Sequence, residues 1–136
     1  MSHEDISVQL LEKDGKIRPV LLQVALEPPW SITLVDQPYA AIHVVGDDLF
    51  DALIRLRQQL NLVGSKLLCR GAAKDVYPSR MGRQMGGGRR AYKLTLGHQA
   101  HFSDLVDIFE YTDAAQISDV DEQKTFYEQW LESLRN

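Results

Sequence analysis

The clearest pattern of apolar positions along the chain is a stripe at helical spacing between residues 49 and 63. Its members recur every three or four positions, as one face of a helix requires. They are Leu49, Leu53, Leu56, Leu60 and Val63, with Phe50 and Ile54 beside them. Asp47 or Asp48 is placed to cap the first turn, and Gly64 stands where a left-handed residue ends a helix. The polar residues between these positions, Arg55, Arg57, Gln58 and Gln59, are expected on the solvent side.

Before this helix, alternating and β-branched segments predict four strands separated by turn residues. The predicted strands cover residues 6–13, 16–26, 31–35 and 39–45, and the breaks between them are Asp14-Gly15, Glu27-Pro28-Pro29 and Asp36-Gln37-Pro38. Asp-Gly between two such strands is a strong hairpin signal. Pro19 predicts an edge strand or a bulge, because proline donates no ladder hydrogen bond.

After the helix, residues 66–70 and 91–96 are predicted strands, and residues 106–111 fit either a strand or a short helix. The stretch from 71 to 90 shows no regular pattern. A last helix is predicted over residues 119–134, with Ser118 as its cap and an acidic first turn. Phe126, Trp130 and Leu134 are spaced four apart in this helix, so we expect an aromatic stripe docked on the fold.

These elements predict one domain spanning residues 1–136, with residues 1–5 disordered. No repeat, linker or low-complexity segment divides the chain. The predicted fold class is α+β: a mostly antiparallel sheet of about six strands with two helices packed on one face.

Composition narrows the setting in which such a domain works. A net charge of −4 makes general nucleic-acid binding unlikely as a function. No apolar run approaches the ~20 residues of a membrane span, and the acidic first residues lack the features of a signal peptide. The chain has a single cysteine, Cys69, which excludes an intramolecular disulfide and fits a reducing compartment. We therefore expect a cytoplasmic protein that does not bind membranes.

The charge is distributed unevenly along the sequence. Residues 66–93 hold eight basic side chains and one acidic side chain, Asp75, whereas the rest of the chain carries a net charge of −11. The basic residues are Lys66, Arg70, Lys74, Arg80, Arg83, Arg89, Arg90 and Lys93. Acidic residues dominate from Asp104 to Glu122, so the basic loop could pair with that segment.

The same basic stretch contains three consecutive glycines, which suggests an anion-binding loop. Glycines bring backbone N–H groups close to a ligand, and arginines offer forked donors to carboxylate or phosphate. The candidate ligand-binding residues are Arg80, Arg83, Gly86, Gly87, Gly88, Arg89 and Arg90. The stretch matches neither a P-loop nor a dinucleotide-binding fingerprint. The alternative is a flexible loop whose arginines pair with structural acids.

A resemblance to a known family rests largely on this stretch. It is carried by Asp75-Val76-Tyr77-Pro78-Ser79, Met81, Arg83, Met85-Gly86-Gly87-Gly88 and Ala91-Tyr92, followed by Leu105-Val106-Asp107-Ile108-Phe109, Phe126-Tyr127 and Trp130-Leu131. With these residues the chain resembles an uncharacterised family of small bacterial proteins over residues 40–134. The resemblance implies a bacterial, cytosolic origin and supplies no activity, cofactor or catalytic residue.

Other reactive side chains form no recognisable catalytic pattern. Cys69 lies in a predicted strand and is expected to be buried and inert, although nearby basic residues could activate a thiolate. His98 and His101 precede Asp104 and Asp107, a weak match to metal-ligand spacing, so no metal site is predicted. Ser79 lacks a nucleophile-elbow sequence around it.

Two functional hypotheses of different classes follow. The first is a non-enzymatic protein-interaction module, accessory or inhibitor-like, with no cofactor. The second is a domain, with or without catalytic activity, that binds a small anionic ligand or a phosphate through residues 71–90. They differ in whether Arg80, Arg83, Arg89 and Arg90 converge on one concave site. Oligomeric state and strand order do not follow from the sequence.

Overall fold

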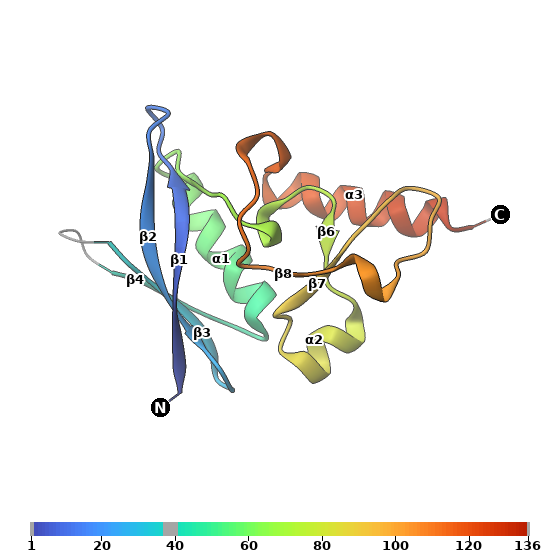
Figure 1. Ribbon diagram of the computed structural model, residues 1–136, viewed down its shortest axis with the longest axis horizontal. Coiled ribbons are helices and arrows are strands. Elements are labelled where there is room, and N and C mark those ends of the chain that lie inside the picture. Colours follow the sequence, from blue (N-terminus) through green and yellow to red (C-terminus); the bar gives the residue numbers. More distant parts are fainter. Residues whose placement is uncertain (1, 37–40, 136) are drawn as a thin grey trace.

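Two antiparallel β-sheets and three α-helices make up the fold, in a computed structural model that describes residues 2–36 and 41–135. The α+β class is therefore confirmed, but the strands form one sheet of five and one of three rather than a single sheet of about six. There are three helices instead of two, and they do not share one face of a sheet, because α1 packs on the larger sheet and α3 on the smaller. Figure 1 shows the larger sheet on one side, α1 beside it, and the smaller sheet with α2 and α3 beyond α1.

The five-stranded sheet is an open, four-stranded meander with a short fifth strand added beside β1. Its strands are β1 His3–Leu11, β2 Ile17–Ala25, β3 Trp30–Val35, β4 Ile42–Gly46 and β5 Lys66–Leu67, in the order β4-β3-β2-β1-β5. The predicted hairpin turn at Asp14-Gly15 is confirmed, with Gly15 at a φ of +89°. β1 begins at His3, so the expectation of disorder over residues 1–5 is wrong for residues 3–5, which pair with β2.

Pro19 lies in an interior strand rather than in the edge strand or bulge that the sequence predicts. β2 has β1 on one side and β3 on the other, but its pairing with β3 covers only Leu21 to Val24. Pro19 is beyond that stretch and pairs with Gln9 of β1, and among the described residues it has no partner on the β3 side. The predicted break at Gln37-Pro38 and the predicted strand start at Tyr39 lie outside the described residues.

The helix α1, Leu49–Asn61, covers the inner face of this sheet and confirms the helical stripe. The Asp48 side chain caps it by accepting a hydrogen bond from the Asp51 amide at 2.7 Å. Two positions differ from expectation. Val63 is 64% exposed because the helix ends before it, and Arg57 is only 7% exposed although its position predicts a solvent-facing side chain.

The second half of the chain consists of short elements. The smaller sheet contains β6 Val76–Tyr77, β7 Arg90–Lys93 and β8 Leu105–Asp107, and 3-10 turns occupy Arg70–Ala72, Phe102–Asp104 and Ala114–Gln116. The strand predicted over 66–70 is shorter in the structure: it ends at Leu67, and a 3-10 turn begins at Arg70. The strand predicted over 91–96 ends at Lys93, and residues 106–111 contain only the end of β8. The region expected to be irregular contains the helix α2, Arg80–Gly86.

The last helix, α3 Val120–Ser133, confirms the C-terminal prediction. Its cap is Asp119 rather than Ser118: the Asp119 carboxylate accepts from the Glu122 amide, and the Glu122 side chain accepts in return from the Asp119 amide. The Tyr127 ring stacks on Tyr77 of β6 with centroids 4.1 Å apart, which docks the helix on the smaller sheet. Within the described residues, no helix has the length and apolar character needed to cross a membrane.

Candidate functional site

The glycine triplet ends α2 and does not form an open anion-binding loop. The Ser79 hydroxyl caps the start of this helix by accepting from the Gly82 amide at 2.9 Å. At the other end Gly87 and Gly88 take left-handed φ values of +68° and +73°, and both of their amides donate to the Gly82 carbonyl. These N–H groups therefore serve the helix end and are not available to a ligand.

Gly87 and Gly88 also join α2 to the larger sheet and α1. A Cβ atom on Gly87 would lie 2.6 Å from the Trp30 ring, and one on Gly88 would lie 3.0 Å from the Asp48 carboxylate. The Gly87 carbonyl accepts a hydrogen bond from the Leu49 amide at 2.7 Å, at the first turn of α1. Only glycine fits this close approach with a positive φ.

Two of the predicted anion-binding arginines form ion pairs within the protein. Arg83 donates through Nε to Asp48 at 2.7 Å and lies over the Phe50 ring. Arg89 bonds Asp107 at 3.1 Å and Glu4 at 3.0 Å, so it connects β8 to β1. Burial lowers the pKa of each arginine, but the hydrogen bonds and charges of these carboxylates outweigh burial, so both pKa values lie above the ordinary value.

The remaining members of the predicted anion site do not converge with these two. Arg80, Gly86 and Arg90 are exposed, and no carboxylate oxygen among the described residues lies within 4.0 Å of either arginine. The structure thus places the seven predicted residues at a helix end, in two ion-pair clusters and on open surface. It does not bring them to one concave site.

The groups considered for covalent or metal chemistry are dispersed. Cys69 is fully buried, and burial raises the pKa of its thiol to about 11. His101 and Asp104 cap a 3-10 turn, and Asp107 accepts from Arg89. Across residues 2–36 and 41–135, no three His, Cys, Asp or Glu side chains are grouped to hold a metal ion.

An open groove lined by aromatic residues lies between the smaller sheet and α3. We call it the aromatic groove. It has a volume of about 390 Å³, and its lining includes Tyr77, Arg80, Tyr92, Leu94, Tyr127, Trp130 and Leu134. Tyr77, Tyr127 and Trp130 form a stacked series, with centroid distances of 4.1 and 6.1 Å. The Trp130 indole N–H donates to the His98 carbonyl at 2.9 Å, which fixes one wall.

The helix that begins at the groove also exposes apolar side chains. α2, whose first residue Arg80 lines the groove, leaves Met81 68% exposed and Met85 82% exposed. The sequence indicates the α3 aromatic residues only as a packing stripe. It does not show that they line an open groove, because the opposite wall comes from Tyr77 and Tyr92 in two short strands.

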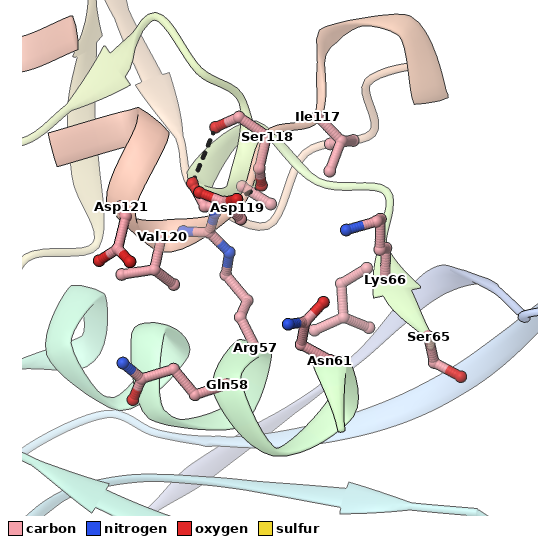
Figure 2. A pocket seen from close by; sticks show the side chains of 12 residues that line it. Arg57, Gln58, Asn61, Ser65, Lys66, Ile117, Ser118, Asp119, Val120 and Asp121 are labelled. Atoms are coloured by element: carbon pink, nitrogen blue, oxygen red, sulfur yellow. Dashed lines mark hydrogen bonds between the residues drawn. The ribbon is translucent and has the colours of Figure 1, made fainter. Parts of the chain in front are cut away.

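A second, smaller pocket lies between α1 and the start of α3. We call it the α1–α3 pocket; it encloses about 170 Å³ and is lined in part by Arg57, Asn61, Ser65, Lys66 and Asp119. Figure 2 shows that the side chains of Arg57, Asn61 and Lys66 project into the space between α1 and the segment from Ile117 to Asp121. Burial lowers the pKa of Arg57, and the negative charge of Asp119 opposes this. An arginine between Leu56 and Gln58 on an amphipathic helix gives no sequence signal of such a site.

In a comparison with known proteins, no family model and no curated protein matches the chain. The resemblance to small bacterial proteins stays a prediction from the sequence.

Proposed function

We propose that this protein is a non-enzymatic interaction module that binds another protein at the aromatic groove. The observation that supports this most is the combination of Tyr92, Tyr127 and Trp130 in one open groove, together with exposed Met81 and Met85 on α2, the helix whose first residue lines that groove. Tyrosine, tryptophan, methionine and arginine are the residue types enriched at protein interfaces, and methionine adapts to varied partners. Such a surface favours a partner that inserts an apolar side chain.

Arg80 gives the groove a preference for partners that carry a negative charge. Arg80 lines the groove, and its guanidinium pairs with no carboxylate among the described residues. A partner segment that carries an acidic residue beside its apolar anchor would supply that carboxylate. The other hypothesis, an anion-binding loop over residues 71–90, draws no support from the geometry, because Arg83 and Arg89 already hold Asp48 and Asp107.

The same proposal includes a setting in the cell. A single, buried, unpaired cysteine supports a cytoplasmic location, and the family resemblance supports a bacterial origin. The reactive groups described above support a role without catalysis, since Cys69 is kept as a neutral thiol and His101 serves a turn.

The test is affinity capture from a lysate of the source cells with three immobilised proteins: the parent, Arg80→Glu and the control Lys16→Glu. Both changes reverse one exposed charge, but Lys16 lies in the β1–β2 turn, outside the groove. An acid at the first residue of α2 suits the positive helix end, so Arg80→Glu should fold. A partner that uses the groove is retained by the parent and by Lys16→Glu and is lost from Arg80→Glu.

A purified partner then allows the affinity to be measured directly. Tyr92→Ala should weaken the complex about 30-fold, since truncating a central interface aromatic typically costs ~2 kcal/mol or more. The proposal fails if no protein is retained reproducibly by the parent. It also fails if Arg80→Glu and Tyr92→Ala retain the partner as well as Lys16→Glu does.

A further inference from the structure

The α1–α3 pocket is built around a buried charge, Arg57, that no carboxylate in the described part of the chain contacts directly; Asp119 acts on it only from beyond 4.0 Å. Arg57 is 7% exposed, and no carboxylate oxygen there lies within 4.0 Å of its guanidinium. Its partners are neutral acceptors: Nη1 donates to Gln123 Oε1 at 2.6 Å and to the Gly71 carbonyl at 3.3 Å, and Nη2 donates to the Ser118 carbonyl at 3.0 Å. Removing a charge from water is unfavourable unless it is compensated, so an anion at this position would be stabilised.

Part of the guanidinium remains free to bind such an anion. An arginine has five N–H donors, and the three contacts above use both donors of Nη1 and one of Nη2. The Nε–H and one Nη2–H donate to no described atom. Nε and Nη2 lie on one edge of the planar group, and such an edge can hold both oxygens of a carboxylate.

The pocket beside this edge offers further donors. Lys66, from β5, projects into the same space as Arg57 and likewise has no carboxylate within 4.0 Å among the described residues. Asn61 at the end of α1 projects there as well (Figure 2), and its amide can donate to a bound oxygen. Two cations from different elements thus share one small cavity with a neutral donor.

Two acidic residues at the edge of the pocket influence which anion fits. The Asp119 carboxylate is engaged as the cap of α3, where it accepts from the Glu122 amide at 2.8 Å. Asp121 lies beyond Val120, on the side away from Lys66 (Figure 2). Their negative charge disfavours a phosphate dianion, which concentrates two charges on one group, more than a carboxylate group, which carries a single charge.

We propose that the α1–α3 pocket is a binding site for a small carboxylate, held by the free edge of Arg57 and by Lys66. This site shares no lining residue with the aromatic groove and does not depend on the proposed protein partner. The cavity of about 170 Å³ suits a short mono- or dicarboxylate.

The test is a titration followed by ¹H–¹⁵N correlation spectra, with acetate, succinate and phosphate as separate probes and chloride keeping the ionic strength constant. The expected result is a saturable shift from acetate or succinate at amides around Lys66 and Ile117 to Asp121. Lys66→Gln should weaken this binding about fivefold or more, because it removes a charged donor. Lys93→Gln, the same change on exposed β7, is the matched control and should bind as the parent does.

A second variant tests the pocket by adding charge. Asn61→Asp places a carboxylate beside Lys66 at an exposed position, and it should weaken succinate binding while leaving the fold intact. Three results would overturn the proposal: no saturable shift from either carboxylate, saturation by phosphate alone, or equal affinities in Lys66→Gln and Lys93→Gln. A protein partner at the aromatic groove would be unaffected by Lys66→Gln, so the two proposals can fail separately.

Discussion

Gln123 is the residue at which the buried polar contacts of this fold converge. Its amide nitrogen reaches the carbonyls of Gly71, Ala73 and Val76 at 2.8–3.0 Å, and its oxygen accepts from Arg57. It is the only buried residue that α3 contributes. Nothing in the sequence distinguishes it from the other polar residues of that helix, because its partners are 47 to 66 positions away along the chain.

Gln123→Ala should therefore destabilise the protein far more than a typical surface change. It leaves the Ala73 and Val76 carbonyls and part of a buried guanidinium without these partners, while the Gly71 carbonyl keeps only the longer contact from Arg57. A loss of about 2–4 kcal/mol in the free energy of unfolding is expected. Urea unfolding measures this, with Gln129→Ala on the exposed side of the same helix as the control. Equal midpoints for the two variants would show that the polar cluster contributes little.

Cys69 gives a prediction about pH. Burial raises the pKa of its thiol from 9.0 to about 11, so between these values the unfolded chain loses this proton while the folded chain keeps it. The stability that this group contributes is present below pH 9 and is lost as the pH rises toward 11. Cys69→Ala should show a shallower decline in stability over this range than the parent, by urea unfolding at several pH values. Parallel declines would contradict the assigned cause.

At the scale of elements, the predictions succeeded where one pattern extends over many residues. The predicted helices α1 and α3 have 13 and 14 residues, more than three turns each, and both are present. The elements whose presence or bounds were predicted wrongly are short: β5 and β6 have two residues each, and α2 has seven. Periodicity is not measurable over so few positions, and these elements are fixed by contacts with distant segments.

The end of α2 permits a matched pair of substitutions. Gly87→Ala adds a Cβ atom 2.6 Å from the Trp30 ring at a φ of +68°, and should destabilise the protein by about 2–4 kcal/mol. Gly86→Ala, one position earlier, meets nothing within 4 Å and lies in the helix, so it should be neutral or stabilise by up to ~1 kcal/mol. Thermal unfolding of both variants measures the difference. A similar melting temperature for the two would mean that the glycines serve a flexible loop after all.

At the scale of the whole molecule, the sequence predicted the α+β class but not the division into two sheets or the pockets near α3. The first half of the chain is a local meander, which residue patterns reveal well. The pockets depend on how α3 meets α1 and the smaller sheet, and the basic charge of residues 66–93 drew attention to Arg83 and Arg89 instead. Their carboxylate partners, Asp48 and Asp107, become apparent only in three dimensions.

Truncation before α3 should disrupt the fold rather than shorten it. A chain ending at Ser118 loses Gln123, the Tyr127 stack on Tyr77 and the cover over Arg57. We expect a poorly packed product that retains its far-UV circular dichroism and loses its near-UV circular dichroism. A monomeric truncation with cooperative unfolding and sharp side-chain resonances would show that α3 is an appendage.

The distance in sequence between Arg57 and Gln123 has a consequence for the order of events during synthesis. The two residues are 66 positions apart, and the Ser118 carbonyl that also binds Arg57 is 61 positions downstream. On the ribosome, β1 to β4 and α1 emerge before either acceptor has been translated. The nascent α1 must therefore keep the Arg57 side chain in water, and the chain can desolvate it only when the beginning of α3 arrives.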